Sequence, residues 1–175
     1  IMDEKYGGGT STGRKPGFFH MGGQSGPIGF PEQLDTPYTY ETLAPKGLAV
    51  GSGAIVVLDD SVCIVEYIQK VFEFFVHESC GKCTPCRLGT TRILELLTDF
   101  VEGRAKDGDV ERLEYMARQV SQLSACGLGQ SVNVALMSAL RHRRGDFEAH
   151  INGGACPAGA CACHENGRNK ACLTI

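Results

Sequence analysis

The sequence predicts an α+β protein in three parts, and three observations support this division. Residues 1–58 are rich in Gly, Pro and Thr and hold short apolar segments, which favours short strands joined by turns. Apolar residues then recur at helical spacing over residues 59–151, which predicts a four-helix bundle. This periodicity stops near residue 151, and a Cys-rich tail follows over residues 152–175. We expect the tail to bind metal.

Short strands are expected in the first part of the chain. The apolar segments at residues 17–21 and 48–50 suit strands that are bounded by turns. Residues 54–58 form an apolar run with two consecutive valines, between Gly53 and Asp59. We therefore predict a strand there.

Helix starts and ends can be placed from capping residues. Asp60 and Ser61 can cap the first helix, and Thr84 followed by Pro85 is a typical start for the second, which ends at Gly103. The four apolar stripes cover residues 64–75, 93–101, 110–123 and 132–140. Each stripe must be buried against another helix, which is why a bundle is expected.

Charge and hydropathy exclude several classes of function. The net charge of −3 does not favour binding to nucleic acid or to an anionic membrane. The longest uncharged apolar run, residues 54–58, is far shorter than the roughly 20 residues that span a bilayer. No signal-peptide pattern opens the chain. We expect a cytoplasmic protein that is not inserted in a membrane and that binds other proteins.

The cysteines carry the strongest functional signal. Nine cysteines without an export signal suit metal binding better than a disulfide scaffold, because a reducing compartment keeps thiols free. Cys80, Cys83 and Cys86 form a Cys-x2-Cys-x2-Cys run, and Cys126 lies at the end of the third predicted helix. Three ligands on one loop and a fourth from elsewhere suit a 4Fe-4S cluster. A structural zinc site with the same four thiolates is the alternative.

The segment around these cysteines resembles a known family. Residues 78–89, ESCGKCTPCRLG, look like the cluster signature of the NADH-binding flavoprotein subunit of complex I and of NAD-linked hydrogenases and formate dehydrogenases. The resemblance covers most of the chain, from the GGQSG segment at residues 22–26 to Phe147 and Glu148.

This resemblance has implications for fold, cofactors and partners. It implies that residues 1–58 end a small β-grasp domain and that the bundle carries the cluster, which takes single electrons from FMN. The FMN and NADH sites would lie on a missing domain or a partner. Gly8 to Lys15 is only a near match to a phosphate loop, so no nucleotide contact is expected here. The implied partners are a flavin/NADH-binding domain and ferredoxin-like or 2Fe-2S subunits.

A second metal site is implied by the tail. The NADH-binding subunits of electron-bifurcating hydrogenases have a similar tail, which resembles a zinc site that attaches the C-terminal extension to the bundle. Carried over by position, its ligands are Cys63, His150, Cys156 and Cys161, which would form a closed structural site. The rival set within the tail is Cys156, Cys161, Cys163 and Cys172.

Other polar residues near the cluster carry weaker signals. His77 is interpreted as a solvated or helix-capping residue, and Lys82 and Arg87 as groups that either screen cluster charge or lie at the surface. The basic run at residues 141–144 suits the negative end of a helix dipole, with partner docking as the alternative.

Two functions follow from these patterns. The first is an electron-transfer module of an NADH-linked, flavin-dependent oxidoreductase. The second is a zinc-stabilised scaffold that joins subunits and passes no electrons.

Overall fold

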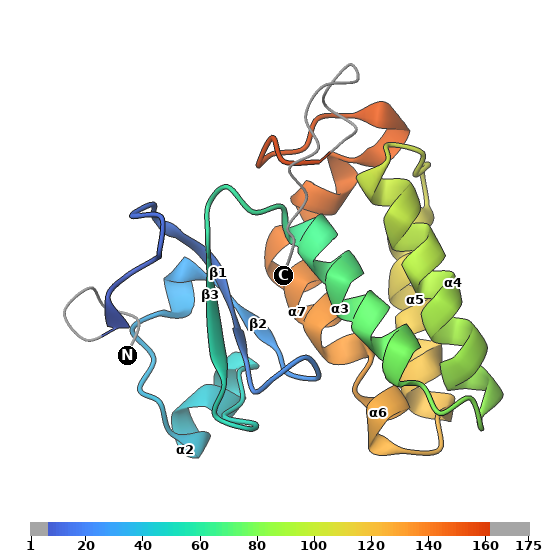
Figure 1. The fold of residues 1–175 in the computed structure, drawn as a ribbon, viewed down its shortest axis with the longest axis horizontal. Coiled ribbons are helices and arrows are strands. Elements are labelled where there is room, and N and C mark those ends of the chain that lie inside the picture. Colours follow the sequence, from blue (N-terminus) through green and yellow to red (C-terminus); the bar gives the residue numbers. More distant parts are fainter. Residues whose placement is uncertain (1–6, 162–175) are drawn as a thin grey trace.

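The computed structural model describes residues 7–161, in which a small sheet packs beside a bundle of helices (Figure 1). The sheet is antiparallel with the order β2-β1-β3. Its strands are β1 (Pro16–Met21), β2 (Ile28–Gly29) and β3 (Ile55–Asp59). The predicted α+β class is confirmed; that the sheet is the end of a β-grasp domain stays a prediction.

Strand β1 is buried on both faces. Phe18 joins the core shared with the helices, whereas its neighbours Phe19 and Met21 pack with Leu43 and Leu48 on the other face of the sheet. This alternation follows from the two-residue period of a strand. The sheet is thus held between the bundle and the segment that contains the short helix α2 (Tyr40–Leu43).

Four long helices form the bundle: α3 (Ile64–Glu78), α4 (Thr84–Val101), α5 (Asp109–Leu123) and α7 (Asn133–Glu148). Each packs against its neighbour in the chain, and α7 returns to α3, so the bundle closes on itself. The short helix α6 (Gly127–Gln130) lies between α5 and α7. Single 3-10 turns occur at Pro31–Gln33, Ala44–Lys46 and Ile151–Gly153. No helix within residues 7–161 is long and apolar enough to cross a membrane.

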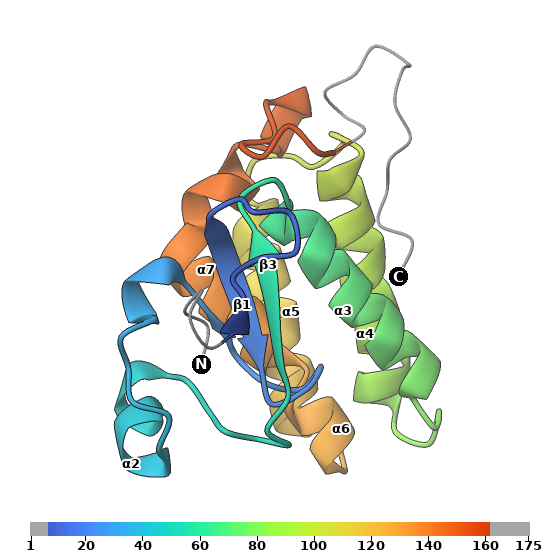
Figure 2. The same ribbon diagram turned by 60° about the vertical axis from the view of Figure 1, so that its left-hand side comes forward.

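The bundle core is rich in aromatic side chains. Phe72, Phe75, Phe100 and Phe147 are fully buried, and burial of each such ring contributes about 1.5–3 kcal/mol. The sheet shares this core, and polar bonds fix its position against the helices. The backbone amide of Ile28 donates to Ser138 Oγ at 2.8 Å. Figure 2 shows the sheet lying across the bundle.

A second polar bond ties the sheet to α3. The ring of His20 lies 2.9 Å from the hydroxyl of Tyr67, and its other nitrogen lies 3.0 Å from the carbonyl oxygen of Gly26. Burial lowers the pKa of His20, and burial raises the pKa of Tyr67 to about 12. Both side chains are therefore neutral near pH 7, which suits an interface inside the protein.

Two local predictions were wrong. Residues 48–50 form no strand. Leu48 instead packs with Phe19, Met21 and Leu43, in the small cluster on the face of the sheet opposite the bundle. Asp60 and Ser61 do not cap the first helix, α3. Its N-cap residue is Cys63, whose side chain makes no capping hydrogen bond. Ser61 donates its amide and hydroxyl to the Asp59 carboxylate instead.

The basic run at residues 141–144 lies at the end of the first, regular part of α7, so the dipole interpretation stays a prediction. The helix is kinked at Arg143, whose guanidinium lies 4.5 Å from the centre of the Phe30 ring and pairs with Glu32. Arg144 pairs with Glu111, Glu114 and Glu148. These bases join α7 to the sheet and to α5.

Candidate metal centres

The first cysteine group lies at the end of the bundle where α3 leads into α4 (Figure 1). Cys83 is the N-cap of α4, Cys86 lies in its first turn, and Cys126 is the N-cap of α6. Cys86 is buried, whereas Cys80 and Cys126 are exposed. Two of these cysteines stand at helix N-termini, where backbone amides point outward and favour negative charge.

The structure brings the Cys126 segment against this loop. The thiol of Cys83 accepts hydrogen bonds from the backbone amide of Ala125 and then from that of Cys86, and these bonds lower its pKa. A Cβ atom at Gly129 would lie 2.3 Å from Ser124 Oγ and 3.3 Å from the Cβ of Cys86. Only glycine permits this approach, so the segment after Cys126 packs directly on the first turn of α4.

This arrangement fits an iron-sulfur cluster. Amides are directed at a sulfur ligand, thiolates come from two segments that lie in contact, and glycine keeps the space between them small.

The loop itself is held by polar contacts. Ser79 Oγ lies 3.4 Å from Cys86 Sγ, and the amide of Gly81 donates to Ser79 Oγ at 3.4 Å. Arg87 donates to the carbonyl oxygen of Gly81 at 3.0 Å, so it closes the loop back onto α4. His77 is 85% exposed and lies beside Glu78, in agreement with a solvated residue.

The second group lies at the opposite end of the bundle. Cys63, His150, Cys156 and Cys161 are all buried, and their ligand atoms lie within 4.8 Å of one another. His150 Nε2 is 3.5 Å from Cys63 Sγ and 3.4 Å from Cys161 Sγ. In a tetrahedral zinc site, bond lengths of about 2.3 Å to sulfur and 2.0–2.1 Å to nitrogen separate these atoms by about 3.6 Å. The four side chains therefore have the spacing that zinc requires.

The histidine is oriented for coordination through Nε2. Its Nδ1 lies 2.6 Å from the carbonyl oxygen of Asp146, which accepts the ring proton and leaves the Nε2 lone pair facing the sulfurs. Burial alone lowers the pKa of His150, but hydrogen bonds to Cys156 and Cys63 raise it to about 10. Without metal, the imidazolium thus balances thiolate charge.

The thiols of this group differ in the direction in which their pKa is shifted. Hydrogen bonds with Cys161 and Cys63 lower the pKa of Cys156, whereas the same crowding raises the pKa of Cys161. Closely packed sulfurs repel one another when all are charged. A divalent cation relieves this repulsion.

A turn in the tail aims its two sulfurs at one point. The amide of Gly159 donates to the carbonyl oxygen of Cys156 at 2.9 Å, and Gly159 has φ of +64°, which favours glycine. The amide of Asn152 donates to the carbonyl oxygen of Ala105, so the segment after α7 is also fixed to the α4–α5 connection. Of the rival ligand set, Cys163 and Cys172 lie outside the described residues.

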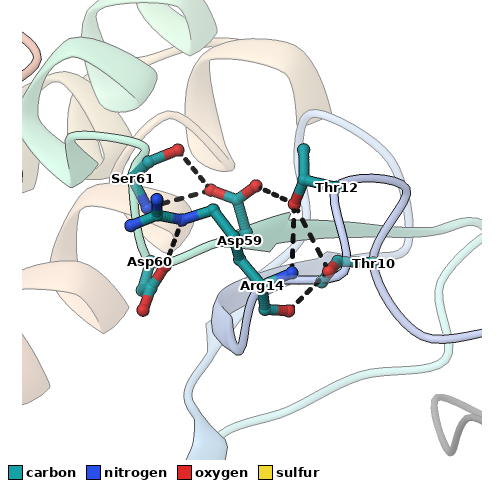
Figure 3. Close-up of polar contacts among 6 residues, drawn as sticks. All are labelled: Thr10, Thr12, Arg14, Asp59, Asp60 and Ser61. Carbon is teal, nitrogen blue, oxygen red and sulfur yellow. Dashed lines mark hydrogen bonds and ion pairs between the residues drawn. The ribbon is translucent and has the colours of Figure 1, made fainter.

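A polar network fixes the turn that precedes Cys63. Figure 3 shows the Asp59 carboxylate accepting from Ser61 and Thr12, while Arg14 pairs with Asp60. The hydrogen bond from the Ser61 hydroxyl is the first cause that lowers the pKa of Asp59, followed by that from Thr12. The network holds the end of β3 against residues 10–14 and so places the start of α3.

Comparison with known proteins identifies the region around the first group. Residues 66–150 match the family described as NADH-ubiquinone oxidoreductase-F iron-sulfur binding region. These residues therefore resemble that iron-sulfur binding region, and the resemblance inferred from the cluster signature is confirmed. The prediction of an iron-sulfur module is likewise confirmed, and nothing in these comparisons favours the zinc-stabilised alternative.

Two relatives illustrate the range of the family. The chain is 39% identical over 155 residues to the second F subunit of the NADH-quinone oxidoreductase of Rhizobium meliloti, a match that covers 88% of this chain and 37% of the relative. It is 34% identical to the HndC subunit of the NADP-reducing hydrogenase of Solidesulfovibrio fructosivorans, over 89% of this chain and 32% of that relative.

Solved structures of similar proteins have the same fold over most of this chain. The crystal structure of an NAD+-reducing [NiFe]-hydrogenase in the air-oxidised state superposes with a TM-score of 0.70 and 31% identity, over 79% of this chain and 24% of that chain. The chain thus spans well under half the length of these relatives.

Two supporting residues were not predicted from sequence. Ser79 precedes the cysteine run and gives no spacing signal of its own. Asp59 had been interpreted only as the boundary of a strand, although Asp followed two positions later by Ser is a typical local turn pattern.

Proposed function

We propose that this chain is the electron-transfer part of an NADH-linked, flavin-dependent oxidoreductase, and that Cys80, Cys83, Cys86 and Cys126 hold a 4Fe-4S cluster. The observation that carries the ligand assignment is the contact between the two cysteine segments, where a Cβ on Gly129 would lie 3.3 Å from the Cβ of Cys86. When bound, such a cluster supplies one-electron transfer and no bond chemistry.

The residues of the bundle have a positioning role in this proposal. Cys83 and Cys126 are the N-caps of α4 and α6, and Gly129 allows α6 to approach α4 closely. Exposed Cys80 and Cys126 leave one side of the site open towards a partner. Electrons would come from FMN on a neighbouring domain or chain, since hydride transfer from NADH delivers two electrons that a flavin must divide.

We also propose a cytoplasmic place in a multi-subunit complex with ferredoxin-like or 2Fe-2S partners. The named relatives are subunits of an NADH-quinone oxidoreductase and of a hydrogenase, which supports such partners. The division of the chain at residues 58 and 151 into sheet, bundle and tail is part of this proposal.

We assign a structural zinc ion to Cys63, His150, Cys156 and Cys161. The spacing of the ligand atoms and the Nδ1 contact of His150 with Asp146 support this assignment. Four protein ligands leave no open position, so the site would join the tail to the start of α3 rather than catalyse a reaction.

Substitution at Cys83 tests the proposed function. Anaerobically purified protein should contain about four irons and four sulfides from one 4Fe-4S cluster, with broad absorbance in the visible range. Cys83→Ala should lose this absorbance, whereas Cys63→Ala, as the matched cysteine control, should keep it. An unchanged iron content and spectrum in Cys83→Ala would overturn the ligand assignment.

A further inference from the structure

We propose that the hydroxyl group of Ser79 donates a hydrogen bond to the sulfur of Cys86 and thereby raises the reduction potential of the cluster. This inference rests on the proposed ligand role of Cys86. It assigns Ser79 as a positioning residue, because Ser79 acts on the cluster through its ligand.

The proposed ligation of Cys86 decides the direction of this hydrogen bond, because a metal-bound thiolate has no proton to donate. Ser79 Oγ lies 3.4 Å from Cys86 Sγ, within hydrogen-bond distance for sulfur, and it accepts the backbone amide of Gly81. A hydroxyl has one proton to donate, and the Gly81 amide occupies a lone pair of the oxygen rather than that proton. The proton of Ser79 is therefore available for the sulfur, which as a metal-bound thiolate can only accept.

The hydroxyl of Ser124 also lies near a cysteine sulfur, but its proton is not available to that sulfur. Ser124 also approaches the sulfur of Cys83, but its hydroxyl proton is donated to the carbonyl oxygen of Val120 at 2.6 Å. The single proton of Ser124 is thus already used within α5. Of these two hydroxyls, that of Ser79 is the one whose proton is not donated to a backbone carbonyl.

Burial increases the effect of this bond. Cys86 is only 4% exposed, so water competes little for its sulfur. A hydrogen bond in such surroundings stabilises negative charge more strongly than one in water. Reduction adds one negative charge to the cluster, so the bond stabilises the reduced form more than the oxidised form and raises the potential.

A purely structural role is the competing explanation, since Ser79 also holds the amide of Gly81. Variants of equal shape with and without the hydroxyl, compared in both metal content and midpoint potential, separate the explanations. Ser79→Thr keeps the hydroxyl, whereas Ser79→Val replaces it with a methyl group and is otherwise similar in size. Ser79→Ala removes the hydroxyl without added bulk and serves as a second test if Val is poorly accommodated.

The experiment is a redox titration of the full chain followed by electron paramagnetic resonance, with iron and sulfide analysis of each sample. We expect Ser79→Val and Ser79→Ala to keep the metal content of the parent and to shift the midpoint potential to a lower value. Ser79→Thr should restore the parent potential. Thr91→Val is the control, because Thr91 lies on the exposed side of α4 and donates to the carbonyl oxygen of Arg87.

Equal shifts in the Thr and Val variants, or a parent potential in the Val and Ala variants, would overturn the inference while the cluster assignment stands. A parent chain that contains zinc and no sulfide would instead overturn the proposed function itself.

Discussion

The sulfur of Cys63 lies 3.5 Å from Nε2 of His150, although 87 residues separate them in the chain. This contact follows from the even number of long helices. Helices α3 and α7 are neighbours that run in opposite directions, so the start of α3 and the end of α7 meet at one end of the bundle (Figure 1). The proposed cluster lies at the other end of α3, about 22 Å away for a 15-residue helix. The two metal sites are thus separate.

Loss of Cys63 is expected to release the zinc ion and loosen the tail. Cys63→Ser removes one of four ligands, so zinc content should fall by about one ion per chain. Binding energy at such a site contributes to folding, and here it closes a long loop. The tail should therefore be cleaved faster in limited proteolysis, while the absorbance of the cluster remains.

The control for this prediction is Cys172→Ser, which removes a ligand of the rival set. It should keep zinc and protease resistance. Retention of zinc in Cys63→Ser together with its loss in Cys172→Ser would show that the tail forms its own site.

Gly129→Ala is expected to disturb the first cysteine group. Its Cβ would lie 2.3 Å from Ser124 Oγ at the end of α5 and 3.3 Å from the Cβ of Cys86 on α4, which forces α6 away from both helices and destabilises the fold by about 1–3 kcal/mol. Iron incorporation should fall with it. Gly127→Ala is a matched control, because a Cβ there meets no atom within 4 Å. Thermal unfolding and iron analysis of both variants test the difference, and equal behaviour would contradict it.

Asp59→Asn is expected to reduce stability in a pH-dependent manner. Hydrogen bonds from Ser61 and Thr12 lower the pKa of Asp59, so the stabilisation is present above the unfolded pKa of about 3.9 and is lost as pH falls through the lower folded value. At pH 7 the variant should be less stable by on the order of 1 kcal/mol. The difference from the parent should shrink in acid.

Urea unfolding at pH 7 and near pH 3 provides the measurement. Asp60→Asn is the control, because its ion pair with Arg14 is about half exposed and contributes little. A constant difference between Asp59→Asn and the parent at both pH values would rule out the carboxylate as the source.

The 175 residues alone are expected not to oxidise NADH. Their sequence holds only a near match to a phosphate loop at Gly8–Lys15, without the Lys-Ser or Lys-Thr pair that binds phosphate. An assay with NADH and an artificial electron acceptor, with and without added FMN, tests this. Dithionite-reduced protein should still pass electrons to the same acceptor, and NADH-dependent turnover by the chain would contradict the expectation.

Local patterns predicted the helices well and the sheet less well. The extents of α4 and α5 follow from apolar periodicity and from Pro85 in the first turn of α4, which are properties of neighbouring residues. The expected start at Thr84 is confirmed, but the N-cap is Cys83, without a side-chain cap. Strand β2 has two residues, which are too few for a periodic signal. The prediction of a strand at residues 48–50 was wrong, because Leu48 is buried by packing against Leu43 of α2 and not by pairing in the sheet. Short elements depend on tertiary contacts.

The sequence by itself determined which residues we propose as metal ligands, because the Cys-x2-Cys-x2-Cys run and the order of cysteines and histidine are written in the chain. Only the tertiary structure decided which of them meet. It placed Cys63 beside His150 and set the Gly129 segment against Cys86. It also placed the hydroxyl of Ser79 3.4 Å from the sulfur of Cys86. The reason is physical: ligand choice depends on chemical type, whereas contacts depend on how helices of given length and direction pack.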